Sequence, residues 1–323
     1  MHRLLIAIAA CALGAAVARA ADPQPYPTKS VRFIMPVAAG GGTDQLGRIV
    51  AQKLTEKWGQ ALVVDNRAGA GGIIGVDMAA KAVPDGYTIV MGYFAPIGVN
   101  VSLFKLPYDP VRDFAPITLL ATSPNLLAVH PSVPAKTVKE FIALARAKPE
   151  EYRYGSGGNG SAMHLSAELF NMMAAVKTTH VPYKGAAPAL LDLLSGQVDM
   201  AFISVPSSLT QIKAGKIRPL AVASARRAAA LPDVPTVDEA AGLKGFESYQ
   251  WYGVLAPAKM PDWIVKRLHR DFVEALNRAD VKAKLYDAGF DLEGSSPAEF
   301  GQFIKNEIAK WAKVIKTANI RAE

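Results

Sequence analysis

Strand-like apolar segments alternate with amphipathic helical patterns along almost the whole chain, and this order constrains the fold more than any other feature. In the first third, strand-like runs at 31–35, 61–65 and 87–92 are separated by helical patterns at 43–57 and 76–82. Strands that are each followed by a helix form parallel sheets covered by helices on both faces. The sequence therefore predicts an α/β fold with a parallel sheet.

The same alternation continues beyond residue 130. The predicted helices cover 138–148, 162–174, 188–195, 261–278 and 297–317, and the predicted strands cover 152–154, 179–183, 198–203 and 218–223.

Two segments are expected to connect separate lobes. The apolar stretch 117–129 is interrupted by Ser123-Pro124-Asn125, and a continuous strand of that length is unusual, so we expect a crossover between two sheets. Near 249–255 the chain returns to the first unit. Two crossovers predict a hinged molecule with a ligand cleft between its lobes. The expected boundaries are residues 21–122 and 250–323 for lobe 1, and residues 123–249 for lobe 2.

The N-terminus has the pattern of a secretory signal peptide. Arg3 precedes the uncharged apolar run 4–17, and Ala18-Arg19-Ala20 forms a small-residue site, so we expect cleavage after Ala20. The apolar run is shorter than the ~20 residues that cross a bilayer. A lipoprotein site at Cys11 is the alternative, but few apolar residues would precede it. We expect an exported protein of about two domains at ~150 residues each.

Loss of the signal peptide changes the composition in two ways that exclude functions. Cys11 is the only cysteine, so the remaining chain has neither a thiol nucleophile nor a cysteine-ligated metal. The net charge of +8 falls by the two arginines at 3 and 19. The remaining Lys and Arg residues are scattered, which argues against nucleic-acid binding. A positive surface modestly favours encounter with anionic ligands.

Two glycine-rich loops, at 36–43 and 155–161, each lie between the end of a strand and the start of a helix. Glycine lets a ligand approach the backbone closely, and a helix N-terminus offers free N–H groups and partial positive charge to an anion. Thr43 and Ser161 are good helix N-caps. Ligands of open α/β sheets lie at the carboxyl ends of strands. We therefore expect both loops to hold one anion, with ordinary tight turns as the alternative.

Candidate binding residues follow from these loops and from neighbouring strand ends. They are Pro36, Ala38, Gly40, Gly41, Gly42, Thr43 and Asp44 in the first loop, and Ser156, Gly158, Asn159, Gly160, Ser161 and His164 in and after the second. Tyr93 and Phe94 follow a strand and would either line the cleft or pack in the core. Lys184 would be either a ligand contact or a solvated turn residue.

Nucleotide and enzymatic sites fit the sequence poorly. Thr43 stands where a P-loop needs Lys, and Gln45 and Ile74 stand where dinucleotide motifs need Gly. A hydrolase would need a glycine at Tyr154, two residues before Ser156, to form a nucleophile elbow. His164 and Glu168 share a helical spacing but have no clustered third metal ligand. We expect no catalytic residue, no metal and no cofactor.

A series of short motifs follows in order along the chain: Pro36-x-x-x-Gly40-Gly41-Gly42-Thr43-Asp44, Val64-Asp65-Asn66-Arg67-x-Gly69-Ala70-Gly71-Gly72, Pro84-Asp85-Gly86-Tyr87-Thr88, Leu106-Pro107-Tyr108-Asp109-Pro110, Asp113-Phe114-Ala115-Pro116, Tyr154-Gly155-Ser156-x-Gly158-Asn159-Gly160-Ser161, Val181-Pro182-Tyr183-Lys184-Gly185 and Leu231-Pro232-Asp233-Val234-Pro235-Thr236. In this order they resemble the receptors of tripartite tricarboxylate transporters, the Bug family of periplasmic solute-binding proteins. The resemblance implies a type II periplasmic binding-protein fold and a small carboxylate ligand. It also implies delivery of that ligand to membrane permease subunits. In the family the two glycine-rich loops hold one carboxylate, largely through backbone groups and ordered water. We expect a monomer.

The sequence departs from the family at two places that bear on the ligand. Many members carry an Asp-Asn pair after the strand that ends near 202, whereas this chain has Ile203 and Ser204. Tyr93-Phe94 replaces smaller or polar residues. Both changes predict a more apolar pocket, with Ile203 in the site, and an aromatic or aliphatic carboxylate rather than an amino acid. The alternatives are a ligand-loaded sensor that docks on a membrane signalling partner, and a serine hydrolase using Ser156 or Ser161.

Overall fold

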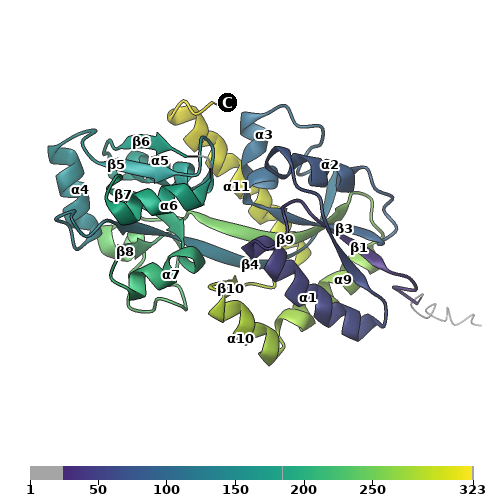
Figure 1. Cartoon of the computed structure of the whole chain (residues 1–323). Helices are drawn as coiled ribbons and strands as arrows, with labels where there is room; N and C mark the ends of the chain where they lie inside the picture. Colours follow the sequence, from purple (N-terminus) through teal and green to yellow (C-terminus); the bar gives the residue numbers. More distant parts are fainter. Residues whose placement is uncertain (1–24, 184, 322–323) are drawn as a thin grey trace, which may run out of the picture.

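The computed structural model describes residues 25–183 and 185–321, which form two α/β lobes joined by two long strands (Figure 1). The expected signal peptide and Lys184 lie outside these ranges. None of the helices in the described ranges combines the length and the apolar character that crossing a membrane requires.

The sheet of the first lobe is mixed rather than parallel. Strands β1 (Val31–Met35), β2 (Leu62–Asn66) and β3 (Thr88–Tyr93) pair in parallel, as the sequence predicts. Strand β9 (Tyr249–Pro257) is antiparallel to β3, and β4 (Phe114–Val129) is antiparallel to β9. The parallel pairing expected for the first three strands is therefore confirmed, whereas β9 and β4 add antiparallel pairs, because β4 leaves the lobe and β9 re-enters it in the opposite direction.

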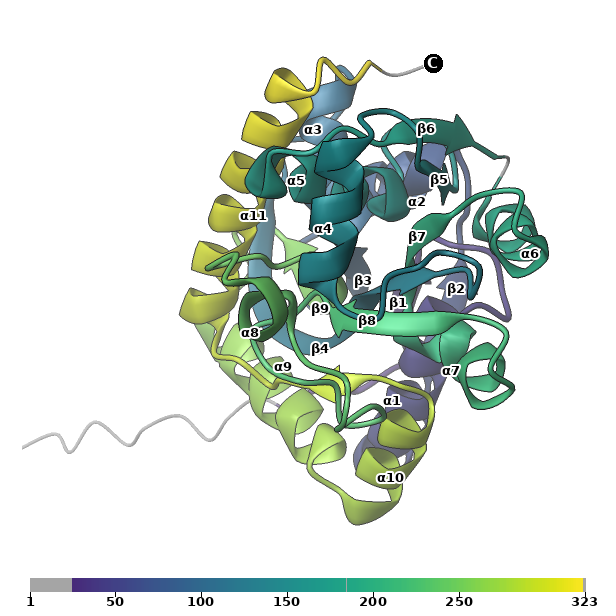
Figure 2. The ribbon, with the colours of Figure 1, turned by 90° about the vertical axis from the view of Figure 1, so that its left-hand side faces the viewer.

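Helices cover both faces of this sheet (Figure 2). Helix α1 (Gly42–Trp58) buries Leu46, Val50 and Leu54 at helical spacing and ends at Gly59, whose φ of 65° is in the left-handed region. The other elements of the lobe are η1 (Ala70–Gly72), α2 (Ile73–Ala80), the π-helix η2 (Phe94–Val99), α3 (Asn100–Leu103), α9 (Asp262–Leu276), α10 (Ala279–Asp287), β10 (Asp291–Leu292) and α11 (Pro297–Thr317).

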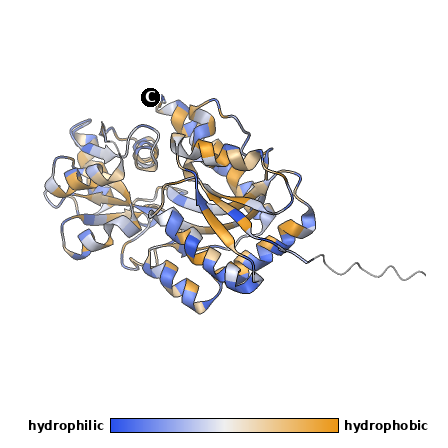
Figure 3. Cartoon of the chain, turned by 45° about the vertical axis from the view of Figure 1, so that its right-hand side comes forward, coloured by the Kyte–Doolittle hydropathy of each residue, from blue (hydrophilic) through white to orange (hydrophobic). Residues whose placement is uncertain are grey.

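The second lobe has its own sheet, in which the end of β4 pairs antiparallel with β7 and β8, and β5 pairs in parallel with β6 and β7. The apolar strands lie inside and the polar helix faces outside (Figure 3). The elements of this lobe are α4 (Val138–Ala147), β5 (Arg153–Ser156), α5 (Ala162–Ala174), β6 (Thr179–Pro182), α6 (Ala186–Ser195), β7 (Met200–Ser204), α7 (Val205–Lys213), β8 (Arg218–Val222) and α8 (Val237–Ala241).

Strand β4 carries the chain from one sheet into the other. It is one strand of 16 residues, although the sequence pattern argued against a continuous strand of that length. Its residues up to Pro124 pair with β9, and those from Asn125 onward pair with β7 and β8. A strand shared between two sheets satisfies its backbone groups along its whole length, which explains why this length is stable.

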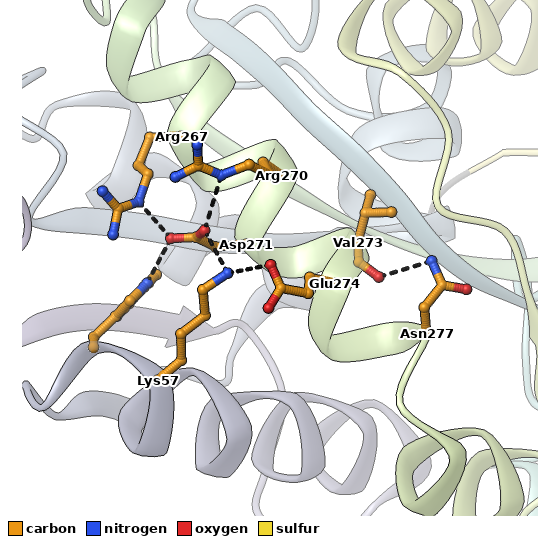
Figure 4. A network of polar contacts seen from close by, with 8 residues as sticks. Lys57, Arg267, Arg270, Asp271, Val273, Glu274 and Asn277 are labelled. Carbon is orange, nitrogen blue, oxygen red and sulfur yellow. Dashed lines mark hydrogen bonds and ion pairs between the residues drawn. The ribbon is translucent and has the colours of Figure 1, made fainter. Parts of the chain in front are cut away.

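A buried carboxylate fixes α1 against α9 (Figure 4). Asp271 is fully buried and accepts hydrogen bonds from Arg267 Nε (2.7 Å) and Trp58 Nε1 (2.8 Å). Lys57 Nζ lies 2.8 Å and Arg270 Nε 3.4 Å from its other oxygen. Burial alone would raise the pKa of Asp271, but these partners outweigh it and hold the pKa below its usual range. The network fixes the helix whose N-terminus faces the cleft.

Candidate ligand-binding site

A cavity of about 710 Å³ lies between the two lobes, a size common for small-molecule sites. Both lobes and both crossing strands contribute to its wall. The lining residues are Gly42, Thr43, Gln45, Ala288 and Phe290 from the first lobe, Ser123, Asn125, Gln250 and Tyr252 from the crossing strands, and Gly157, Ser161, Ala162, Met163, Ala186, Ala187, Leu190, Ile203, Ser204, Pro206 and Ser207 from the second lobe.

Four helix N-termini meet at this cavity. The first turn of α1 contributes Gly42 and Thr43 from the first lobe, and the first turns of α5, α6 and α7 contribute residues from the second lobe. The first N–H groups of a helix have no partner within it, and each N-terminus carries roughly half a positive charge. Among the described lining residues no side chain is charged. The cavity is therefore suited to an anion.

The crossing strands supply a polar floor. Ser123 on β4 is 1% exposed, and its hydroxyl has no hydrogen-bond partner among the described residues. Asn125 donates from Nδ2 to Ser166 Oγ (2.9 Å). Burial raises the pKa of the Tyr252 phenol on β9, with an opposing hydrogen bond from Thr43. Tyr252 stays a neutral hydroxyl, so the floor offers hydroxyl and amide groups without charge.

Asp44 stabilises the first glycine-rich loop by hydrogen bonds on the side away from the cavity. Its Oδ2 accepts the Gly40 N–H (2.9 Å) and Arg48 Nε (2.9 Å), and its Oδ1 accepts Asn66 Nδ2 (2.9 Å). Burial would raise the pKa of Asp44, but the bonds from Arg48, Gly40 and Asn66 outweigh burial and lower it. Asp44 is 2% exposed and is absent from the cavity wall. It fixes the loop that leads into Gly42 and Thr43.

The second glycine-rich loop is held in a similar way. Ser156 is fully buried, and its Oγ accepts the Gly158 N–H (3.1 Å) and shares a hydrogen bond with His180 Nε2 (2.6 Å). Ser161 caps α5 by accepting the His164 N–H (3.3 Å). A serine beside a histidine would suit a hydrolase, but a fully buried hydroxyl gives a substrate no access.

The structure brings only some of the predicted site residues to the cavity. Gly42, Thr43, Ser161 and Ile203 line it. The other first-loop candidates, Pro36, Ala38, Gly40, Gly41 and Asp44, precede or support its wall, and Ser156, Gly158, Asn159, Gly160 and His164 lie in or behind the second loop. Lys184 lies outside the described residues.

The two aromatic candidates lie away from the cavity wall. The Tyr93 hydroxyl donates to the Gly71 carbonyl (3.2 Å). Phe94 is 1% exposed and packs edge-on against Trp311, with ring centroids 5.1 Å apart. Phe94 therefore occupies the core, which was the alternative that the sequence left open.

The site also contains residues that the sequence reasoning missed. The residues on α7 could have been predicted from the sequence, because Ser204-Val205-Pro206 has the N-cap and the proline that are typical of a helix start, directly after a strand. The residues of the cavity floor could not have been predicted in this way, because Gln250 and Ser123 are distant in sequence and come together only in the folded chain.

The two-lobed fold and the inter-lobe cavity define a periplasmic-type solute-binding protein. Residues 46–320 match the family model described as "Tripartite tricarboxylate transporter family receptor". The chain belongs to this family. Its members among solved structures are solute-binding proteins, and the chain is not an enzyme.

Relatives cover nearly the full chain. A "UPF0065 protein in tcbD-tcbE intergenic region" of Pseudomonas sp. (strain P51) is 38% identical over 99% of this chain and 96% of its own length. Protein BugT of Bordetella pertussis is 34% identical over 98% and 97%.

Solved structures share the fold closely. R. palustris Rpa4515 with adipate is 41% identical, with a TM-score of 0.77 over 92% of this chain and 99% of that one. MatC from Rhodopseudomonas palustris with bound malate is 34% identical, with a TM-score of 0.74 over 90% and 100%.

Proposed function

We propose that this chain is a periplasmic receptor that captures a small carboxylate between its lobes and delivers it to the membrane permease of a tripartite tricarboxylate-type transporter. The observation that carries the proposal is the meeting of four helix N-termini at one cavity. A carboxylate there would accept charge-assisted hydrogen bonds from neutral donors, each contributing about 1.5–3 kcal/mol. The adipate and malate of the two relatives support the same ligand class.

The wall of the cavity favours a carboxylate with an apolar body over an amino acid. Met163, Leu190, Ile203 and Phe290 contribute apolar surface. An ammonium group would need an acidic partner, and no described lining residue is acidic. We propose an aliphatic or aromatic mono- or dicarboxylate as the ligand.

Native mass spectrometry of the freshly purified protein would identify a carried ligand by its mass. Calorimetry on ligand-free protein would then compare adipate and benzoate with glutamate. We expect adipate to bind and glutamate to bind far more weakly, and benzoate tests whether the apolar body of the ligand can be aromatic. Tight binding of glutamate, with no binding of adipate or benzoate, would contradict the proposed ligand class.

A charge reversal in the wall tests the anion site itself. Ile203→Asp places a carboxylate at the cavity, and at an effective dielectric constant of about 20 two like charges 5 Å apart repel by roughly 3 kcal/mol. We expect about a hundredfold loss of carboxylate affinity. Ile203→Asn is the matched control, because it has nearly the same shape as the Asp variant without its charge. Equal affinities in the two variants would refute an anion at this wall.

Delivery to a permease is tested by uptake. We expect cells that lack this chain to lose accumulation of the radiolabelled ligand, and the chain restored on a plasmid to recover it. If the purified protein binds the ligand but cells that lack it take up the ligand as well as the wild type does, a sensor function is favoured instead.

A further inference from the structure

Three stacked rings lie behind the second glycine-rich loop, away from the ligand cavity. Tyr154 on β5 stacks on His180 of β6, and His180 stacks on His164 of α5, with ring centroids 4.8 and 4.0 Å apart. The two histidines border a separate cavity of about 430 Å³, which residues 318–321 beyond α11 also line. Neither histidine lines the large cavity between the lobes.

Each histidine is bonded to a different part of the loop. His180 Nε2 shares its hydrogen bond with Ser156 Oγ, which in turn accepts the Gly158 N–H. His164 Nδ1 accepts the Gly160 N–H (3.1 Å). A backbone N–H can only donate, so His164 Nδ1 carries no proton and the neutral ring is protonated at Nε2.

The loop held by these rings leads directly into the ligand cavity. Gly158 and Gly160 have φ values of 110° and 72°, so the loop follows a backbone path that other residues rarely adopt. Gly157 and Ser161 of the same loop, together with the first turn of α5, line the ligand cavity. A shift of Gly160 would therefore move the N–H groups that face the ligand.

We propose that His164 and His180 are positioning residues for carboxylate binding, and that they hold the second glycine-rich loop in its binding shape as long as His164 is neutral. This inference rests on the proposed function, because it requires that the second glycine-rich loop binds the carboxylate.

Burial and the second histidine keep His164 neutral. Burial and the neighbouring His180 lower the pKa of His164 to about 4, and burial lowers the pKa of His180. Glu168 accepts a hydrogen bond from the Tyr154 hydroxyl (2.5 Å). Glu168 and Arg321 both border the small cavity, with charges of opposite sign.

The first test uses two substitutions at position 164. His164→Phe keeps a ring in the stack but removes the acceptor, whereas His164→Asn keeps an acceptor and does not titrate. With adipate as the probe near neutral pH, we expect His164→Phe to weaken binding about tenfold, the loss of one hydrogen bond with its geometry. His164→Asn should recover most of that loss, and His130→Asn, remote from the loop, should match the wild type.

The second test is a pH profile. The ratio of wild-type to His164→Asn affinity cancels the protonation of adipate itself. We expect this ratio to fall as the pH is lowered toward about 4, because protonated Nδ1 cannot accept the Gly160 N–H. A constant ratio over this range, or full-strength binding by His164→Phe, would overturn the positioning role.

A measurement without ligand separates the two proposals. In the wild-type protein, the protection of the Gly160 amide, measured as its exchange rate relative to the intrinsic rate at each pH, should fall over the same acidic range. ¹⁵N spectra should show His164 protonated at Nε2 alone near neutral pH. If adipate and benzoate both fail to bind while these signals appear, the proposed ligand fails and the support of the loop by His164 stands. A His164 protonated at Nδ1 near neutral pH overturns the inference whatever the ligand.

Discussion

Replacing Asp44 by Asn removes one negative charge from the support of the first glycine-rich loop with little change of shape. The carboxylate accepts three hydrogen bonds of 2.9 Å, from Gly40, Arg48 and Asn66. An amide has one oxygen, so its NH₂ group would face two donors if Asn66 kept its bond. Loss of this charge-assisted bonding at a 2% exposed side chain should cost about 2–3 kcal/mol.

The effect of Asp44→Asn can be measured as a lower melting temperature and as a weaker affinity for adipate. For a chain of this size, about 2–3 kcal/mol lowers the melting temperature by roughly 4–10 °C. Adipate affinity should fall as well, because the loosened loop carries Gly42 and Thr43 at the cavity. Glu56→Gln on the same helix is the control, since its ion pair with Lys53 is at the surface and contributes about 0–1 kcal/mol.

The pH dependence of the stability provides a second test of the role of Asp44. The folded-state pKa of Asp44 is below its usual range, so its stabilising contribution is present at neutral pH and is lost as the pH falls through that lowered pKa. Asp44→Asn should lack this component of acid destabilisation. A variant as stable as the wild type, with unchanged adipate affinity, would refute the reasoning that Asp44 supports the loop.

Three further predictions concern stability. Asp271→Asn should cost about 1.5–3 kcal/mol in urea unfolding, because the fully buried side chain loses its charge-assisted hydrogen bonds from Arg267 and Trp58; a loss no larger than a surface ion pair would contradict this. His164, with a pKa of about 4, should make unfolding easier as the pH falls from about 6.5 to 4, by up to about 3 kcal/mol, and His164→Asn should remove that slope in pH-dependent calorimetry. Gly253→Ala should cost about 1–3 kcal/mol by overlap with the buried Phe300 ring, and an unchanged melting temperature would count against it.

Elements whose pattern is local were predicted well from the sequence. The bounds of β1, α5 and α11 agree with those expected, because each has a clear periodicity between capping or turn residues. The direction of β9 and the length of β4 were not predictable in this way. Both depend on pairing between segments more than a hundred residues apart, for example Ser123 with Gln250.

The site was predictable only in part. Gly42, Thr43 and Ser161 follow from the rule that ligands lie where strands end and helices begin. Asp44 and His164 were expected to touch the ligand, whereas the structure places them behind the loops as hydrogen-bond partners of Gly40 and Gly160. Proximity in sequence could not distinguish a residue that lines a loop from one that supports it. The signal-peptide cleavage site, the lobe boundaries and the role of Lys184 stay predictions.

Titration calorimetry of ligand-free protein with adipate and with adipamide tests whether the cavity between the lobes is built to hold an anion. The two molecules have nearly the same length and apolar body, but only adipate presents carboxylates to the helix N-termini at the cavity. We expect saturable one-to-one binding of adipate and no measurable binding of adipamide. Comparable affinities for the two would contradict a site built to hold an anion.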